Sequence, residues 1–138
     1  MSAAFDTVDH STLLRRSHLA FGINDTAYRW FQSYLSSRKQ YVRRGPSKSS
    51  VAYPVCGVPQ GSVLAPILFV LYTVDLLTAI ESHGLSPHLY ADDTQVYGSC
   101  RPSAVTTFTT KVAECVEDAT SWMRFNRLHP NPDKTEVL

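Results

Sequence analysis

Cysteine is scarce in this sequence: its three cysteines, Cys56, Cys100 and Cys115, lie far apart. An odd number at this spacing is typical neither of a disulfide framework nor of a cysteine metal site. A signal peptide is also missing at the start of the chain. These absences favour a reducing, intracellular compartment, and we expect a nuclear or cytoplasmic location.

The sequence has no long hydrophobic run. Its most apolar stretch, residues 63–74, is too short to span a bilayer and is followed by Asp75. We therefore expect a buried helix there and no membrane partner. Internal repeats and low-complexity linkers are absent as well. The 138 residues, 43% of them hydrophobic, are enough for one packed domain or for a piece of a larger one.

Net charge is low, at +1, but it is unevenly distributed. Residues 1–50 carry a net charge of +5, and residues 51–138 carry −4. The basic half contains a cluster of cations made up of Arg38, Lys39, Arg43, Arg44 and Lys48. Such clusters bind phosphate backbones. The alternative is an ordinary solvated turn.

Capping residues predict two helices near the start of the chain. Asp9 or Ser11 is expected to cap the first helix, which Gly22 ends. Asn24 or Asp25 is expected to cap the second, in which aromatic and aliphatic residues recur at helical spacing.

Short strands and a tight loop should follow. Residues 40–42 and the alternating apolar residues of 51–55 predict two strands joined by a turn. Residues 57–62 predict a tight loop, in which Gly61 permits unusual dihedral angles and a close approach of a ligand. Ser62 can cap the apolar helix that comes next.

The second half predicts a break, a long helix and a last strand. Gly84 and Pro87 should break the chain before another extended segment. A long helix opens at residues 102–103, the prolines of 130–132 end it, and a strand begins at Lys134. Helices mixed with hairpins favour an α+β fold over a parallel βαβ fold.

Two adjacent acids, Asp92 and Asp93, interrupt an extended apolar pattern that runs from residue 89 to 97. This pattern predicts a β-hairpin with the acids at its tip. Adjacent carboxylates repel each other, and Mg²⁺ neutralises such a pair well because it prefers oxygen ligands. Taken alone, the dipeptide fits an ordinary turn that faces water equally well.

Four motifs in one order carry a resemblance to a known family. They read SAAFDTVDH (2–10), GVPQGSVL (57–64), YADD (90–93) and NPDKTE (131–136). Together they resemble the reverse transcriptase of non-LTR, LINE-type retrotransposons, an RNA-directed DNA polymerase. The resemblance implies a partial reverse transcriptase domain over residues 1–138, namely the palm of a right-hand polymerase. Most of the fingers and the whole thumb would be missing from it.

The resemblance also implies partners and chemistry. An RNA template, a DNA primer and a dNTP would be the substrates, and two Mg²⁺ ions would clamp the attacking and leaving oxygens. Asp92 and Asp93 match metal ligands of the family, and Asp92 is the better match.

Further roles come from the same resemblance. Phe5 matches an aromatic residue under the incoming sugar, while Gln60 and Gly61 match a loop that touches the nucleotide and the template base. Lys134 matches a lysine proposed to protonate pyrophosphate. The alternatives are a core position for Phe5, a capping side chain for Gln60 and an ordinary ion pair for Lys134.

The sequence departs from the family pattern at three places. Ala65 replaces a usual glycine, and Pro130 replaces a hydrophobic residue beside the lysine strand. Met1 stands at the leucine position of the first motif, so the metal-ligand aspartate would precede it. Asp6 lies too far along to replace that ligand, roughly 20 Å away in an extended chain. We therefore expect that this chain alone does not extend a primer.

Two classes of function remain open at this point. The chain is either the polymerase domain of a longer active protein, or a catalytically dead remnant that binds nucleic acid weakly. An unrelated two-metal phosphohydrolase would need further ligands near Asp92, where His88 is the nearest candidate.

Overall fold

The computed structural model of the protein describes residues 4–136. Helices alternate with two small antiparallel sheets, which confirms the predicted α+β class. The elements are η1 (Ala4–Asp6), α1 (His10–Phe21), α2 (Asp25–Leu35), β1 (Arg43–Arg44), β2 (Ser47–Lys48), α3 (Ala65–Ser82), β3 (Ser86–Tyr90), β4 (Asp93–Tyr97), η2 (Pro102–Ala104), α4 (Val105–Phe125) and η3 (Pro132–Lys134).

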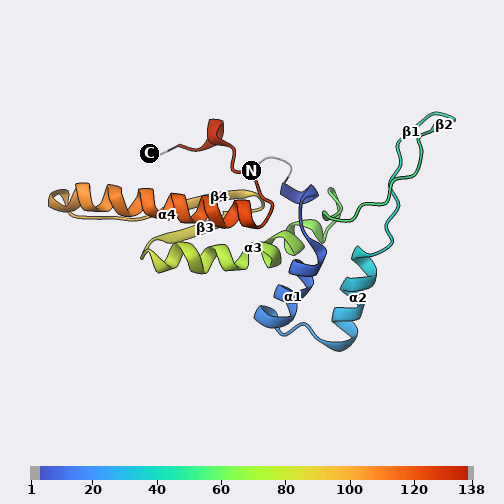
Figure 1. Cartoon of the computed structure of the whole chain (residues 1–138), viewed down its shortest axis with the longest axis horizontal. Helices are drawn as coiled ribbons and strands as arrows, with labels where there is room; N and C mark the ends of the chain where they lie inside the picture. Colours follow the sequence, from blue (N-terminus) through green and yellow to red (C-terminus); the bar gives the residue numbers. More distant parts are fainter. Residues whose placement is uncertain (1–3, 137–138) are drawn as a thin grey trace.

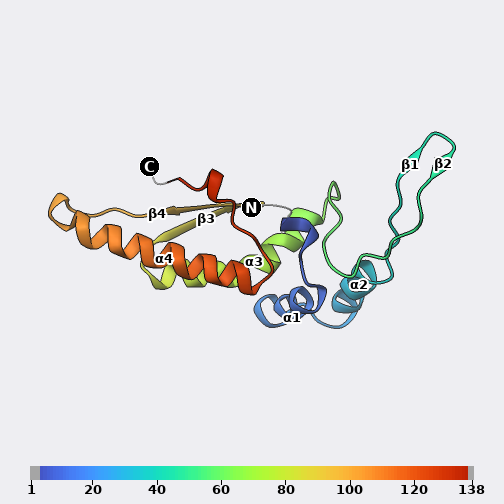
Figure 2. The same cartoon turned by 45° about the horizontal axis from the view of Figure 1, so that its top comes forward.

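The molecule is elongated and its two ends differ (Figure 1). At one end, α3 and α4 run side by side, with the β3–β4 hairpin next to them. At the middle, α1 packs against α3, and α2 packs against α1. The β1–β2 ribbon projects away from the helices at the other end, as the turned view in Figure 2 also shows.

Helix α1 begins and ends where its capping residues predict. The Asp9 carboxylate accepts hydrogen bonds from the Thr12 backbone N–H at 2.8 Å and from the Ser11 hydroxyl at 2.6 Å. Gly22 adopts the left-handed conformation with φ of 63°, and its N–H donates to the His18 carbonyl. Both helix ends are therefore satisfied by local hydrogen bonds.

Helix α3 is the core helix of the fold. At its start the Ser62 hydroxyl accepts from the Ala65 N–H at 3.1 Å, but the N-cap residue is Leu64 and not the predicted Ser62. Leu68, Phe69, Leu76 and Ile80 are at most 1% exposed. By length and composition alone, α3 is also apolar enough to cross a membrane. It packs against α1, α4 and β3, which bury part of its apolar surface.

The strands predicted at residues 40–42 and 51–55 are wrong. The ribbon instead pairs Arg43 with Lys48 and Arg44 with Ser47, and an isolated bridge joins Gln40 to Ala52. The apolar residues of the predicted strands are largely exposed, so no buried face holds a longer ladder in register.

Two expectations about prolines are also wrong. Helix α4 ends at Phe125, before either proline, where the Leu128 N–H donates to the Met123 carbonyl and Leu128 is fully buried. Pro87 does not precede the hairpin but lies within β3, opposite Val96. A two-stranded sheet has only edge strands, which tolerate a residue without an N–H.

Candidate functional site

The predicted acidic hairpin is present, and the register of its two strands shows where the two acids lie. Tyr90 pairs with Asp93, so Ala91 and Asp92 form a two-residue turn. Leu89 and Val96 pack against the hydrophobic core. Tight hairpin turns need a positive φ, and Ala91 supplies it with φ of 52°, a conformation strained for a residue that has a Cβ.

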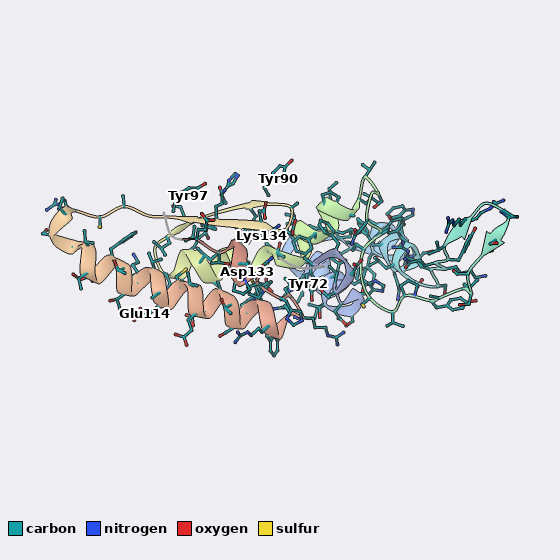
Figure 3. All side chains as sticks on the ribbon, turned by 90° about the horizontal axis from the view of Figure 1, so that it is seen from above. Tyr72, Tyr90, Tyr97, Glu114, Asp133 and Lys134 are labelled. Atoms are coloured by element: carbon teal, nitrogen blue, oxygen red, sulfur yellow. The ribbon has the colours of Figure 1, made fainter. Side chains whose placement is uncertain are left out.

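The two acids do not share one environment. Asp92 is half-buried in the turn, whereas Asp93 is exposed on the outer face of the hairpin. There it lines a shallow depression of about 260 Å³ together with His88, Tyr90 and Gln95. Tyr90 projects from this face, on the side away from α4 (Figure 3).

The loop of residues 57–61 is tied to the η1 segment by backbone hydrogen bonds. The Val58 N–H donates to the Phe5 carbonyl at 2.8 Å, and the Gly57 N–H donates to the Val8 carbonyl at 2.7 Å. The Gln60 amide donates to the Asp6 carboxylate at 3.0 Å. The structure thus brings the neighbourhoods of Phe5 and Gln60 together.

Phe5 is half-buried, and its ring lies 4.9 Å from that of Phe69 on α3, centroid to centroid. The turn of the β3–β4 hairpin lies next to η1 in both views (Figures 1 and 2). One end of α3 therefore carries η1, the 57–61 loop and the acidic turn close to one another.

The two glycines of this loop have different surroundings. Gly61 has φ of 79°, and a Cβ there would meet no atom within 4 Å, so its surroundings are open. Gly57 has φ of 87°, and a Cβ there would lie 2.9 Å from the Asp6 carbonyl oxygen. Sequence reasoning missed Gly57. The positive φ of both residues favours glycine, but only Gly57 is packed against the site.

Lys134 does not lie on a strand, contrary to the prediction. It ends η3, where the Asn131 side chain accepts from the Asp133 N–H and the Asn131 carbonyl accepts from the Thr135 hydroxyl. These local bonds compete with a strand ladder. Residues 137–138 of the predicted strand, and Ser2 and Ala3 of the first motif, lie outside the described residues.

Within residues 4–136, no three or more histidine, cysteine or acidic side chains come together as a metal site. Asp6 binds Gln60, and Asp9 caps α1. The hydrogen bond from the Ser11 hydroxyl, followed by that from the Thr12 N–H, lowers the pKa of Asp9 to about 2. The oxygen donors at the hairpin tip are thus the carboxylates of Asp92 and Asp93.

Comparison with known proteins decides the family. The family model described as reverse transcriptase (RNA-dependent DNA polymerase) matches residues 1–138. The chain belongs to the reverse transcriptase family. A probable RNA-directed DNA polymerase from transposon BS of Drosophila melanogaster is 33% identical, over 98% of this chain and 15% of its own length.

Two further relatives narrow the type of element. The RNA-directed DNA polymerase from mobile element jockey of the same fly is 35% identical over 67% of the chain and 10% of its own length. A Pol polyprotein from the type-1 retrotransposable element R2 of Popillia japonica is 34% identical over 56% of the chain and 13% of its length. This is a reverse transcriptase domain of the non-LTR, LINE type, and it spans a small part of these relatives. No solved structure matches it significantly.

In this reverse transcriptase domain, the basic cluster lies far from the acidic hairpin. Arg38 follows α2, and Lys39, Arg43, Arg44 and Lys48 are exposed on or beside the β1–β2 ribbon. Figure 1 shows this ribbon at the opposite end of the molecule from α4. The cations and the paired acids therefore form two separate sites.

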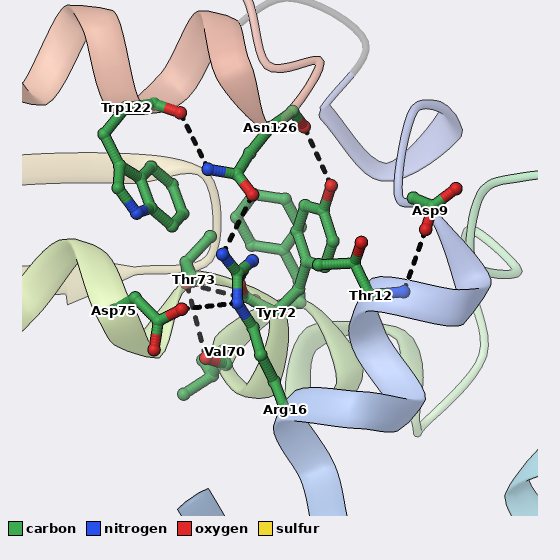
Figure 4. Close-up of polar contacts among 10 residues, drawn as sticks. Asp9, Thr12, Arg16, Val70, Tyr72, Thr73, Asp75, Trp122 and Asn126 are labelled. Carbon is green, nitrogen blue, oxygen red and sulfur yellow. Dashed lines mark hydrogen bonds and ion pairs between the residues drawn. The ribbon is translucent and has the colours of Figure 1, made fainter. Parts of the chain in front are cut away.

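Sequence reasoning also missed a buried arginine that joins three helical segments (Figure 4). Arg16 of α1 donates to the Asp75 carboxylate at 2.6 Å, to the Tyr72 carbonyl at 2.6 Å and to the Asn126 side-chain oxygen at 2.9 Å. Its guanidinium also lies 5.2 Å from the Tyr72 ring and 5.1 Å from the Trp122 ring. The one available signal was Asp75, an acid in the middle of a mostly apolar helix.

Proposed function

We propose that this domain contributes the acidic hairpin of a polymerase palm to RNA-directed DNA synthesis. A deoxynucleotide would be transferred from dNTP onto a primer 3′-hydroxyl, with pyrophosphate leaving. The observation that carries the proposal is the juxtaposition of the Ala91–Asp92 turn, η1 and the 57–61 loop at one end of α3.

The donor set at the hairpin tip suits magnesium. Asp92 and Asp93 offer only carboxylate oxygens, which Mg²⁺ prefers over nitrogen or sulfur, and substrate phosphates complete such sites. When bound, the ions supply charge neutralisation and activation of the 3′-hydroxyl. Asp92 would be the principal ligand, because it lies in the turn that approaches η1. A second ion would need further oxygen ligands besides these two acids.

Three residues would position the incoming nucleotide. The contact with Phe69 fixes the Phe5 ring, which would lie under the sugar. The bond to Asp6 orients the Gln60 amide, whose oxygen can accept a hydrogen bond from the nucleotide. The open space at Gly61 lets a base or a phosphate approach the backbone.

Lys134 would protonate the leaving pyrophosphate. The side chain is exposed at the end of η3, so it is accessible to a charged substrate. Its long, flexible stem and its ammonium group suit contact with a phosphate oxygen.

The nucleic-acid partners would be an RNA template and a DNA primer. Arg38, Lys39, Arg43 and Arg44 would bind their phosphates without reading sequence. The curated relatives are several times longer than this chain, so we propose that fingers and thumb segments of a parent protein hold the duplex over the site.

A second candidate is a catalytically dead remnant that only binds nucleic acid. The observation that favours it is the lack, within the described part of the chain, of a third acid near Asp92 and Asp93. The two candidates differ in whether the hairpin holds a divalent ion.

A Mn²⁺ titration followed by NMR tests this difference. Mn²⁺ should broaden the backbone amide signals of residues 90–94 first, and Asp92→Asn should abolish that broadening. Glu114→Gln is the matched control, because Glu114 is an exposed acid on α4, away from the hairpin (Figure 3). Equal broadening in wild type and Asp92→Asn would favour the remnant.

RNA-templated primer extension tests the reaction itself. We expect the longest protein that carries this domain to extend a primer with Mg²⁺, and Asp92→Asn to remove the activity. Retained extension in Asp92→Asn would show that the ligands are misassigned.

A further inference from the structure

Helix α2 carries two stacked aromatic rings that the fold covers only in part. The Trp30 and Tyr34 rings are stacked, with centroids 5.3 Å apart and planes 11° apart. Arg38 lies beyond the end of α2 at Leu35, and its guanidinium is 5.9 Å from the centre of the Tyr34 ring. The spacing of four residues places Trp30 and Tyr34 on one face of the helix.

The fold covers this face only in part: Tyr34 is half-buried against the hydrophobic core, whereas Trp30 is more exposed. Leu35 is the only buried residue of α2, and 51% of Trp30 is exposed. Helix α2 packs against α1, and Trp30 is the exposed member of this group, while Tyr34 and Arg38 are half-buried. The exposed part of Trp30 gains nothing from burial within this fold, so it is available to a binding partner.

These residues lead directly into the basic ribbon. Lys48 lies 3.7 Å from the centre of the Tyr41 ring, which repeats the pairing of a cation with an aromatic ring. No acid occurs between Asp25 and Asp75, although this stretch holds six cations. The ion pairs found among residues 4–136 involve none of those six. Aromatic rings and positive charges without acidic partners therefore occur together along one surface.

We propose that this surface, which consists of Trp30, Tyr34, Arg38, Lys39, Arg43, Arg44 and Lys48, binds single-stranded nucleic acid. A base stacks on the exposed Trp30 ring, and the phosphates that follow it contact the cations of the ribbon. Aromatic platforms in a positive groove bind single strands because every base has a flat face. In a duplex the bases are already stacked on each other, so Trp30 has nothing to bind.

The inference deepens the nucleic-acid binding of the proposed function, but it makes a separate claim. This surface includes the β1–β2 ribbon, which projects away from the helices at the end of the molecule opposite α4 (Figure 2). It therefore binds strand outside the reaction centre, and Mg²⁺ at Asp92 is not needed for it.

Fluorescence anisotropy with labelled oligonucleotides tests the proposal. The probes are dT20, rU20 and a 20-base-pair DNA duplex, each measured at several salt concentrations. We expect Trp30→Ala to weaken dT20 and rU20 binding roughly five-fold or more, since one base stack contributes at least that much. Duplex binding should change less than about two-fold. Comparing dT20 with rU20 shows which sugar the surface prefers.

Three variants separate stacking from charge and from misfolding. Trp30→Phe keeps a flat ring and should keep part of the affinity. Phe125→Ala removes another exposed aromatic residue, 90% exposed at the end of α4, and should leave binding unchanged. Arg43→Ala/Arg44→Ala should lower the salt slope by about two, whereas Trp30→Ala should leave the slope unchanged.

Clear outcomes overturn the inference. Unchanged dT20 and rU20 affinity in Trp30→Ala, or an equal loss of duplex affinity, would mean that only the cations bind. If wild type does not bind single strands but self-associates, and Trp30→Ala removes this self-association, the face is a protein contact instead. Asp92→Asn should bind oligonucleotides like wild type, so a failed metal site and a failed strand surface give different results.

Discussion

Arg16 and the arginines of the ribbon show how one residue type behaves differently in two regions of this molecule. Arg16 is 7% exposed and makes hydrogen bonds to three residues far apart in sequence. Arg43 and Arg44 are exposed, and the one hydrogen bond of the Arg43 side chain goes to the nearby Gly45 carbonyl at 3.2 Å.

The difference lies in what surrounds the charge. A guanidinium loses its hydration when it is buried, so it needs several acceptors in fixed positions, which Asp75, Tyr72 and Asn126 provide. An exposed guanidinium keeps its water and adds little to stability, but it remains available for phosphates. The core therefore uses an arginine to fix the fold, whereas the ribbon leaves its arginines exposed to solvent.

The largest expected effect comes from breaking the core side of this comparison. Arg16→Ala removes the hydrogen bonds and leaves the buried Asn126 side chain without its donor. We expect a loss of about 3 kcal/mol in the free energy of unfolding, measured by urea denaturation. Arg15→Ala changes the exposed neighbour on the same helix and should lower stability by less than about 0.5 kcal/mol. Equal losses in the two variants would contradict the comparison.

The second largest effect on stability is expected at the contact between the hairpin and α4. A Cβ on Gly98 would lie 2.6 Å from side-chain atoms of both Leu85 and Phe108. Gly98→Ala should therefore destabilise the protein by about 1–3 kcal/mol through overpacking, as seen in thermal unfolding. Adding Phe108→Leu should recover part of this loss. No recovery in the double variant would show that the backbone at Gly98, and not the packing, is responsible.

A smaller effect is expected at the cap of α1. Asp9→Ala should lower stability by about 1 kcal/mol at pH 7, because the Thr12 N–H loses its acceptor. Because the folded-state pKa of Asp9, about 2, lies below the unfolded value of roughly 3.9, its contribution is present above pH 4. That contribution is lost as the pH falls toward 2.

Asp9→Asn separates the cap from its charge. Asparagine caps helices as well as aspartate does, but it does not titrate. Urea denaturation at pH 2 to 5 should therefore show a flatter pH dependence for Asp9→Asn than for wild type. A slope equal to that of wild type would assign the pH dependence to other acids.

The smallest effect on stability is expected in the ribbon. Arg43→Ala/Arg44→Ala should change the free energy of unfolding by less than about 0.5 kcal/mol while it weakens nucleic-acid binding. Urea denaturation and oligonucleotide binding on the same preparations check both halves of the statement. A loss of stability above about 1 kcal/mol would mean that the ribbon is a structural element after all.

The local signals in the sequence predicted local structure well. Asp9 and Gly22 predicted the ends of α1, and the adjacent acids predicted the hairpin turn. Each of these features depends on hydrogen bonds between residues a few positions apart, which residue types and their spacing determine. The four ordered motifs likewise sufficed to predict the reverse transcriptase family.

Other local predictions failed because no packing partner enforced them or because a competing turn was equally available. The alternating residues of 51–55 look like a strand, but they find no buried face to hold them. Lys134 follows Pro132 and Asn131, whose side chain closes a turn in place of a ladder. Periodicity alone does not say whether a second surface exists for a segment to cover.

The sequence by itself thus determined the family, the capped helices and the position of the paired acids. Only the tertiary structure decided that Arg16 is buried against Asp75, 59 positions away, and that Gly57 packs on Asp6. It also decided that Trp30, stacked on the half-buried Tyr34, is exposed to solvent. The physical reason is that burial and long-range pairing depend on which surfaces come into contact after folding. The residue type at a single position does not determine that contact.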